Sequence, residues 1–493
     1  MDAESLQRDV REGRLDPERL IDIILRQQRQ LAEAKRKIKE LEQSGQRTKQ
    51  SGAPFSLQAE EKRQQGRGKK RFQPGPAKRR GRIHLAKKLA QAERTEKVFP
   101  AGVPQSDCHL SHTRLAWRLE NGHAARVAYE IYRGPKNQYG KISGVLGRSE
   151  FGWEIVLALA FQIYIVGLSF DKACLLLGFF QNLTLRKSQA EAIVKQLAKH
   201  WEREFDHLCT LLAHSAVVHA DETSWSLHSV WAILSEQARV LLFGVHKDAA
   251  TLAKLLDPAT FAGLMISDDA AVYSNFTHAQ KCWAHLLRKA IKLTLLDPTK
   301  EMYRDFTDRL LEIYHAACRL QCDKRFSAAG RAAKVMELDD RLLELCGATW
   351  SAELPKLEGT DDDFRLLCNE LMRLMLAEEL FTFVNAAPIT QPNGITQPVA
   401  GTNNEAERTL RGPALARKTG RTNKTLRGAK RQTIIVSVLE SLRCYLPRFT
   451  LQEVIAETQN WLDTGQSCFA KLLQKLSLTT SDSPLQALFP APR

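Results

Sequence analysis

The chain changes from one pattern of apolar and polar positions to another, and the changes mark its predicted elements. Short apolar runs at 216–220, 230–234, 240–245 and 263–267 have the length and the polar or glycine boundaries of strands. A turn-rich break between the second and third runs indicates a hairpin. The pattern predicts three strands, a helix at 248–257, a strand, a short helical piece, and a short strand leading into a longer helix.

Helical patterns lie on both sides of this strand-rich segment. Residues 152–213 are predicted as helices, and Ser188–Glu191 matches a capping box that opens the longest of them. Two short helices and a turn in this segment fit either a helix-turn-helix DNA-binding unit or a bundle that supports the core. Amphipathic helices over 302–320, 328–345 and 363–381 precede a proline-rich loop.

Two further patterns precede the helices. Asn121-Gly122, between alternating runs at 115–119 and 124–132, predicts a β-hairpin. A heptad seam near the N-terminus predicts a short coiled coil, for which self-association and packing on the protein's own core are the alternatives. The seam consists of Leu20, Ile24, Gln27, Leu31, Ala34, Ile38 and Leu41.

The net charge of +16 is concentrated in two places. Residues 62–88 hold twelve Lys and Arg, residues 408–431 hold nine, and neither stretch contains an acid. Such clusters bind phosphate backbones by releasing counterions, without sequence preference. Glycine, proline and glutamine among the charges of 62–88 also indicate a flexible linker. Its candidate DNA-binding residues are Lys69, Lys70, Arg71, Arg79 and Arg80.

The composition indicates a cytoplasmic, nucleoid-associated protein without a membrane span. Ten cysteines at scattered spacings, with no secretory leader pattern, give no disulfide framework. The most apolar stretch, 155–170, is 16 residues long and contains Gln162, which is short for a membrane span. A chain of 493 residues is long enough for two to four domains.

Three acids stand where a carboxylate metal site would need them. Asp221 and Asp268 each follow an apolar run, and Glu407 lies at the start of a predicted helix with the basic stretch behind it. Mg²⁺ prefers a few carboxylates together with waters and substrate phosphates. Two such ions roughly 3.5–4 Å apart can activate an attacking oxygen and stabilise the leaving one in phosphodiester chemistry. The alternative for each acid is a turn residue or a helix cap.

Four motifs in order resemble bacterial DDE transposases of the insertion sequence 66 family, over roughly residues 95–470. They are His219–Trp225, Ile266–Asp268 with Tyr273, Cys282–Lys289, and Gly401–Arg411 with Arg417–Arg421. The resemblance implies a ribonuclease-H-like core and Mg²⁺-dependent cleavage and strand transfer at transposon ends, with Mn²⁺ as a candidate substitute. It also implies that Asp221, Asp268 and Glu407 are the catalytic and metal-binding triad. The third acid of the family directly precedes an arginine, which selects Glu407 over Glu405.

Further site residues are predicted near the three acids. Arg408, Arg411, Arg417, Lys418 and Arg421 are the predicted DNA-binding residues beside the third acid. Cys282, His285 and Asn404 are predicted active-site neighbours, and His285 is either a phosphate-orienting residue or a structural histidine.

One departure from the family concerns zinc. Many members carry a cysteine-rich zinc ribbon before the core, whereas the corresponding region here has only Cys108, near His109 and His112. Zinc needs four ligands, commonly from paired Cys-x-x-Cys motifs, and the chain contains no such pair. We therefore expect no zinc.

The predicted protein is α+β: a ribonuclease-H-like mixed-sheet core with a helical insertion, preceded by a helical domain and an N-terminal coiled-coil helix. The predicted function is transposition; the alternatives are a ribonuclease-H-like nuclease or resolvase without strand transfer and a catalytically silent DNA-binding repressor. The partners would be terminal inverted repeats, target DNA, further copies of the chain and candidate accessory proteins of the element. The predicted segments are a coiled-coil helix at 1–45, a basic linker at 46–95, a small β unit at 96–150, a helical domain at 151–213, the first part of the core at 214–293, the insertion at 294–400, the core helix with the third acid at 401–475, and a tail at 476–493.

Overall fold

The computed structural model describes residues 89–147, 149–347, 349, 358–480 and 483–490, which all belong to the unit Ala77–Arg493. The predicted coiled-coil helix at 1–45 and most of the predicted linker at 46–95 lie outside the described residues. The same holds for the candidate DNA-binding residues Lys69, Lys70, Arg71, Arg79 and Arg80.

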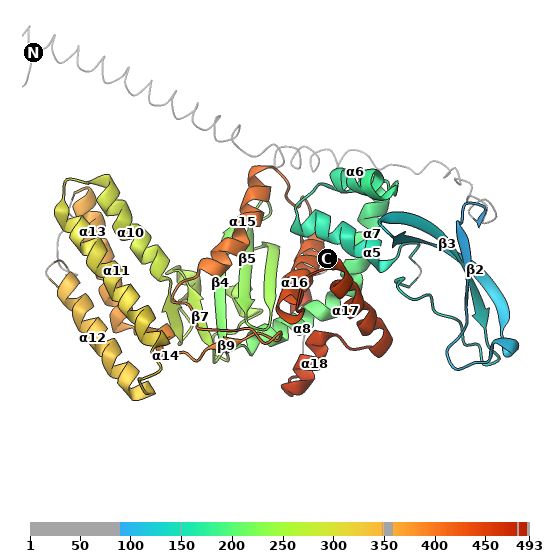
Figure 1. Cartoon of the computed structure of the whole chain (residues 1–493). Coiled ribbons are helices and arrows are strands. Elements are labelled where there is room, and N and C mark those ends of the chain that lie inside the picture. Colours follow the sequence, from blue (N-terminus) through green and yellow to red (C-terminus); the bar gives the residue numbers. More distant parts are fainter. Residues whose placement is uncertain (1–88, 148, 348, 350–357, 481–482, 491–493) are drawn as a thin grey trace, which may run out of the picture. The chain divides into compact units, whose positions relative to one another are not determined.

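The largest sheet has five strands in the order β6-β5-β4-β7-β8 (Figure 1). Neighbours are antiparallel from β6 to β4 and parallel from β4 to β8. This order confirms the predicted succession of elements and makes the first and fourth strands neighbours. The elements are β4 (Val217–Ser224), β5 (Ser229–Ser235), β6 (Arg239–Val245), α9 (Ala249–Ala253), β7 (Leu264–Ser267), a 3-10 turn (Ala271–Tyr273), β8 (Ala279–Lys281) and α10 (Trp283–Leu296).

Both faces of the sheet are covered, so its central strands are apolar on both sides. On one face, Val230 and Phe243 pack against Ala406 and Leu410 of helix α15 (Asn404–Lys418). On the other face, Trp231 and its neighbours join a large core that continues into the helices of the preceding segment.

Helix α16 (Leu426–Tyr445) covers the outer edge of the sheet, along β6. An uncovered edge strand presents unpaired N–H and C=O groups that can pair with another chain. Here three hydroxyls spaced four residues apart on α16 accept hydrogen bonds from alternate amides of β6, at 2.9, 3.0 and 2.9 Å. The pairs are Thr433 with Phe243, Ser437 with Leu241, and Ser441 with Arg239.

The segment before the sheet is helical, as predicted. Its elements are α5 (Trp153–Ala160), a π-helical turn (Phe161–Ile165), α6 (Phe170–Gln181), α7 (Lys187–His200) and α8 (Glu202–Ala213). The predicted capping box at Ser188–Glu191 was wrong by two residues, because Gln189 is the third residue of α7 and its side chain accepts from the Arg186 amide at 3.0 Å. Buried residues of α5, α7 and α8 share one core with the sheet, so these helices support it.

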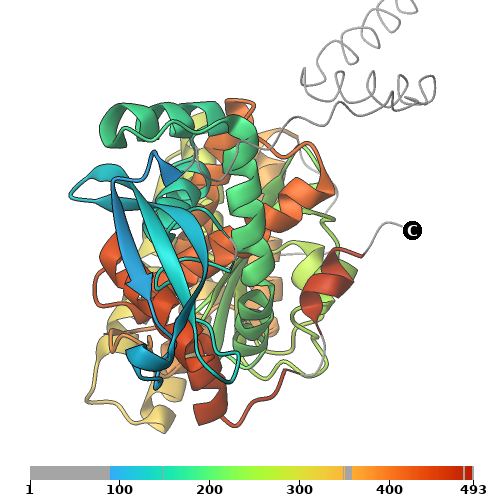
Figure 2. The ribbon, with the colours of Figure 1, turned by 90° about the vertical axis from the view of Figure 1, so that its right-hand side faces the viewer.

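A small sheet precedes these helices, and Figure 2 looks onto its strands, drawn in blue. It contains β1 (Arg94–Val98), β2 (His109–Glu120) and β3 (His123–Arg133), with a 3-10 turn at Gln105–Asp107. β2 and β3 form the predicted hairpin, and both turn residues, Asn121 and Gly122, have positive φ. Such angles suit Asn-Gly turns that match the twist of the strands.

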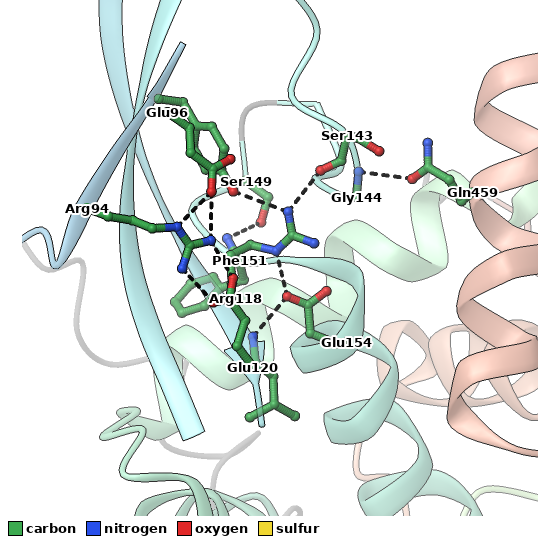
Figure 3. Close-up of polar contacts among 12 residues, drawn as sticks. Arg94, Glu96, Arg118, Glu120, Ser143, Gly144, Ser149, Phe151, Glu154 and Gln459 are labelled. Carbon is green, nitrogen blue, oxygen red and sulfur yellow. Dashed lines mark hydrogen bonds and ion pairs between the residues drawn. The ribbon is translucent and has the colours of Figure 1, made fainter. Parts of the chain in front are cut away.

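A buried carboxylate joins this hairpin to the helical segment (Figure 3). Glu154 of α5 accepts from the Arg118 Nε at 2.7 Å and from the Leu119 amide at 3.0 Å. Arg118 also donates to the Ser143 carbonyl, and the Gly144 amide next to it donates to Gln459. A buried charge is stable only when it is paired and hydrogen-bonded, and Glu154 meets this condition.

The predicted helical insertion is present and has its own core. Its elements are α11 (Glu301–Cys322), α12 (Ala328–Cys346), α13 (Thr360–Leu376) and α14 (Thr382–Asn385). The core joins these helices to α10 and to Ile266 of β7. The predicted return loop contains a short hairpin of β9 (Ile389–Thr390) and β10 (Thr396–Gln397). The insertion therefore packs against the parallel side of the sheet.

The C-terminal part consists of α15, α16, α17 (Leu451–Thr464), α18 (Cys468–Lys475) and α19 (Pro484–Leu488). Trp461 and Phe469 of α17 and α18 belong to the core shared with α8 and the sheet. Among the described residues, no helix is both long and apolar enough to cross a membrane.

Candidate active site

The parallel register of β4 and β7 brings two predicted acids to the same level of the sheet. His219 of β4 pairs with Ile266 of β7. Asp221 and Asp268 each follow two residues later, and residues two apart on a strand point to the same face. Asp221 does not end its strand, as the sequence had suggested, because β4 continues to Ser224 in a hairpin with β5. Asp268 directly follows β7, as predicted.

Glu407 lies in the first turn of α15, and the buried Asn403 anchors the start of this helix. The Asn403 side-chain amide donates to the Ala220 carbonyl at 2.7 Å, next to Asp221. Its backbone amide donates to the sulfur of Cys282 at 3.1 Å. One residue thus joins α15 to β4 and to the start of α10.

The charges of the three acids interact. Burial is the main cause that raises the pKa of Asp221 from 3.8 to about 7, and the charges on Glu222, Asp268 and Glu407 raise it further. The Glu222 amide, which donates to the Asp221 carboxylate at 2.9 Å, acts in the opposite direction. Burial and neighbouring negative charge therefore both disfavour the ionised form of Asp221, and a bound cation would favour it.

Glu405 and Glu407 have different partners, although they are only two residues apart. Residues at this spacing point to opposite sides of a helix. Glu405 forms an ion pair with Arg239 of β6. Glu407 accepts from Arg288 of α10 at 2.6 Å, and its carboxylate lies 3.5 Å from the Nδ1 of His285. The structure therefore separates the two acids, and only Glu407 acts on the charge of Asp221.

The predicted neighbours Cys282 and His285 lie beside Glu407. One ligand atom from each of the three residues lies within 4.8 Å of the others. Cys282 is the N-cap of α10 and is buried, which raises the pKa of its thiol, while backbone amides from Asn403 and His285 lower it. Asn404 begins α15, where its backbone carbonyl accepts from the Arg408 Nε at 3.1 Å.

The basic residues after Glu407 divide into two groups. Arg408, Arg411 and Lys418 are exposed on α15. Arg417 donates to the Ser224 carbonyl at 2.7 Å, and Arg421 donates to the Gly167 carbonyl at 2.8 Å. The second group therefore also joins α15 to the sheet and to the helical segment.

Glu222, Lys247 and Tyr273 were not among the predicted site residues, although Glu222 and Tyr273 lie within the first two motifs. Glu222 follows Asp221 and so points to the opposite face of β4, where its side chain is 1 % exposed. It pairs with the Lys247 ammonium at 2.6 Å and accepts a hydrogen bond from the Tyr273 hydroxyl. The signal in the sequence is an acid on the buried face of a strand, because such an acid needs a partner.

A cavity of about 650 Å³ opens beside this site, between the sheet edge and the insertion. Asp268, Cys282 and His285 line one side of it, and Glu370 and Arg373 of α13 line another. Two ion pairs lie in its wall, since Lys289 contacts Glu370 at 2.5 Å and Arg373 pairs with Asp269. The insertion therefore contributes a wall next to the predicted acids.

Comparison with known families gives one match. Residues 148–431 match the model of the IS66 transposase family, and this range is more than half of the chain. It contains Asp221, Asp268 and Glu407 as well as Cys282 and His285. A comparison with curated proteins found no match. On the strength of the family match, which agrees with the four motifs and with the mixed α and β architecture, this chain belongs to the IS66 family of transposases.

Proposed function

We propose that this protein is a DNA transposase that binds the ends of its element and catalyses Mg²⁺-dependent strand cleavage and strand transfer. We also propose that β4–β8 with α10 and α15 form a ribonuclease-H-like catalytic core. One observation carries the proposal: Asp221 and Asp268 lie at the same level of adjacent parallel strands, and the charge of Glu407 on α15 raises the pKa of Asp221.

The residues at this point fit hard divalent cations. The three acids supply carboxylate oxygens, which Mg²⁺ prefers. Burial and then the charges of its acidic neighbours raise the pKa of Asp221, so a bound cation would stabilise its ionised form. Asp221, Asp268 and Glu407 would hold the ions. When bound, such ions activate the attacking oxygen and stabilise the leaving oxygen of a phosphodiester.

The chain's other residues would orient the acids and the DNA. Arg288 of α10 holds Glu407, and Asn403 fixes the start of α15 against β4. Arg411 lies one helical turn after Glu407 and therefore on the same side of α15, where it would contact a phosphate near the scissile bond. The side chain of Arg288 is 52 % exposed, so it can also exchange Glu407 for a DNA phosphate.

Two steps would then follow at one site. In the first, water attacks a phosphorus at the element's end, and the bond to the 3′ oxygen breaks, which leaves a 3′-OH and a 5′-phosphate. In the second, that 3′-OH attacks a phosphorus of target DNA, and a target 3′ oxygen leaves. One phosphodiester bond forms as another breaks, so the second step needs no external energy source.

The alternatives retained from the sequence predict different products. A nuclease or resolvase with the same core would hydrolyse DNA without joining ends to a target, and a repressor would bind without cleaving. The basic residues on α15 and the large insertion favour the transposase.

The test uses the full chain, Mg²⁺, a supercoiled target and DNA fragments from the flanks of the gene. Cleavage at a fixed position together with joined products supports the proposal. Cleavage without joining favours the nuclease, and specific binding without cleavage favours the repressor.

A further inference from the structure

Cys282, His285 and Glu407 bring three different ligand types to one place. Their sulfur, nitrogen and oxygen atoms lie within 4.8 Å of one another. Cys282 and His285 are three residues apart at the start of α10, so both side chains lie on the same side of the helix. Glu407 approaches them from α15, with 3.5 Å between its Oε1 and the His285 Nδ1.

Two features indicate a site prepared for a ligand. The His285 Nδ1 is shielded from solvent and has no hydrogen-bond partner, although most buried polar atoms have one. The Cys282 sulfur accepts a hydrogen bond from the Asn403 backbone amide at 3.1 Å, and the Cys282 residue is only 1 % exposed. The cavity beside the site reaches both Cys282 and His285, which gives an ion a path from solvent.

We propose that Cys282, His285 and Glu407 form a second metal site, selective for a thiolate-binding divalent cation such as Zn²⁺, which shares Glu407 with the proposed catalytic site. Thiolate and imidazole ligands suit Zn²⁺, whereas Mg²⁺ takes oxygen ligands. Three protein ligands and one open position are a common arrangement for zinc outside purely structural sites. The open position here would face the cavity.

The shared carboxylate gives the site a regulatory consequence, which rests on the proposed function. While Glu407 is bound to Zn²⁺ with Cys282 and His285, it would donate less charge to a catalytic ion, even where its second oxygen reaches that ion. Zn²⁺ would therefore inhibit Mg²⁺-dependent cleavage. Arg288 would have to release Glu407, and this costs little because an ion pair with a half-exposed arginine is weak.

The first experiment measures binding without DNA or Mg²⁺, so its result does not depend on the proposed function. Tag-free full-length protein is titrated with Co²⁺ and followed by absorption in the near-ultraviolet and visible ranges. We expect one high-affinity equivalent with a thiolate-to-cobalt charge-transfer band. Cys282→Ser should remove the band, and His285→Gln and Glu407→Gln should each weaken binding about tenfold or more.

The matched control is Cys174→Ser, which changes a half-buried cysteine on α6 and should leave the band intact. His285→Gln retains the thiol, so it tests the site even if Cys282→Ser fails to fold. Absence of the band in the unmodified protein, or its persistence in folded Cys282→Ser, would overturn the proposal. Unchanged cobalt affinity in Glu407→Gln would overturn the proposal that the two sites share the Glu407 carboxylate.

The second experiment adds stoichiometric Zn²⁺ to the cleavage reaction at excess Mg²⁺. We expect a loss of rate that a chelator selective for zinc reverses. Full activity with Zn²⁺ bound would overturn the regulatory consequence. If the protein cleaves no DNA at all, the proposed function fails, whereas the cobalt titration still decides the metal site.

Discussion

The Tyr273 hydroxyl donates a hydrogen bond to the Glu222 carboxylate, and this contact joins the segment after Asp268 to the strand that carries Asp221. Lys247 pairs with the other oxygen of Glu222 at 2.6 Å. The three groups lie on the opposite face of β4 from Asp221. We therefore expect these contacts to hold the segment after Asp268 in position against β4.

Tyr273→Phe should reduce the cleavage rate about tenfold while DNA affinity stays unchanged. The substitution keeps the ring in the core but removes the donor, which costs about 1 kcal/mol of stability and loosens the Asp268 segment. Single-turnover cleavage at saturating protein, together with a Mg²⁺ titration, measures this effect. The control is Tyr445→Phe, which removes a buried hydroxyl that donates to the Gln237 carbonyl at 2.9 Å, away from the acids. Equal losses in the two variants would contradict a positioning role for Tyr273.

Asp221→Asn should stabilise the metal-free protein at pH 8. The pKa of Asp221 is about 7 in the folded protein and 3.8 in the unfolded chain. Below about pH 4 the carboxyl is protonated in both states and does not affect stability. As the pH rises from about 4 to 7 it ionises only in the unfolded chain, so the folded protein loses stability. The asparagine removes that loss, which is on the order of a few kcal/mol above pH 7 and smaller at pH 5. Thermal melts in EDTA at the two pH values measure it. A variant less stable than the parent at pH 8 would show that the site tolerates the charge of Asp221 without a metal.

Arg288→Ala should raise the Mg²⁺ affinity of the free protein and weaken DNA binding. The variant frees Glu407 from its ion pair, and it removes a cation that would contact one phosphate. The slope of log affinity against log salt should fall by about 0.9. Arg304→Ala, which removes an exposed cation at the start of α11, beside the end of α10 that lies away from the acids, is the control and should change neither quantity. Identical behaviour of the two variants would reduce Arg288 to a surface charge.

Arg408→Ala with Arg411→Ala should flatten the salt dependence of DNA binding by about two units for all sequences alike. Both side chains are exposed beside Glu407, so they would contact phosphates next to the scissile bond, and single-turnover cleavage should also slow. Lys471→Ala with Lys475→Ala removes two cations from α18 and serves as the matched control. If the α15 pair leaves both slope and rate unchanged, α15 does not face DNA.

The order of the core elements could be predicted from the sequence because each strand is a short apolar run with clear boundaries. The register between β4 and β7 could not, because it depends on packing between segments that are far apart in the chain. The choice of Glu407 over Glu405 had to come from the family resemblance. In the structure, the helix turns Glu407 toward Arg288 and Glu405 toward Arg239.

Other contacts had no readable signal. Three hydroxyls of α16 accept hydrogen bonds from the backbone amides of β6. In the sequence they look like ordinary polar positions, because their partner strand lies almost 200 residues earlier. The predicted cap at Ser188 was wrong because α7 begins two residues earlier, with Arg186 as its N-cap. Arginine is not a residue of the capping-box pattern, so the sequence pattern did not predict this start.

We propose that Asp221, Asp268 and Glu407 together bind the divalent ions that DNA cleavage requires. The most direct measurement is Mn²⁺ binding and single-turnover DNA cleavage in Asp221→Asn, Asp268→Asn and Glu407→Gln. Their neighbours Asp269→Asn and Glu405→Gln, whose carboxylates pair with Arg373 and Arg239, are the controls. We predict that each of the three site variants loses cleavage by at least about a thousandfold and loses bound Mn²⁺, while DNA binding and both controls are retained. Cleavage retained in any site variant, or lost equally in the two controls, would contradict the account.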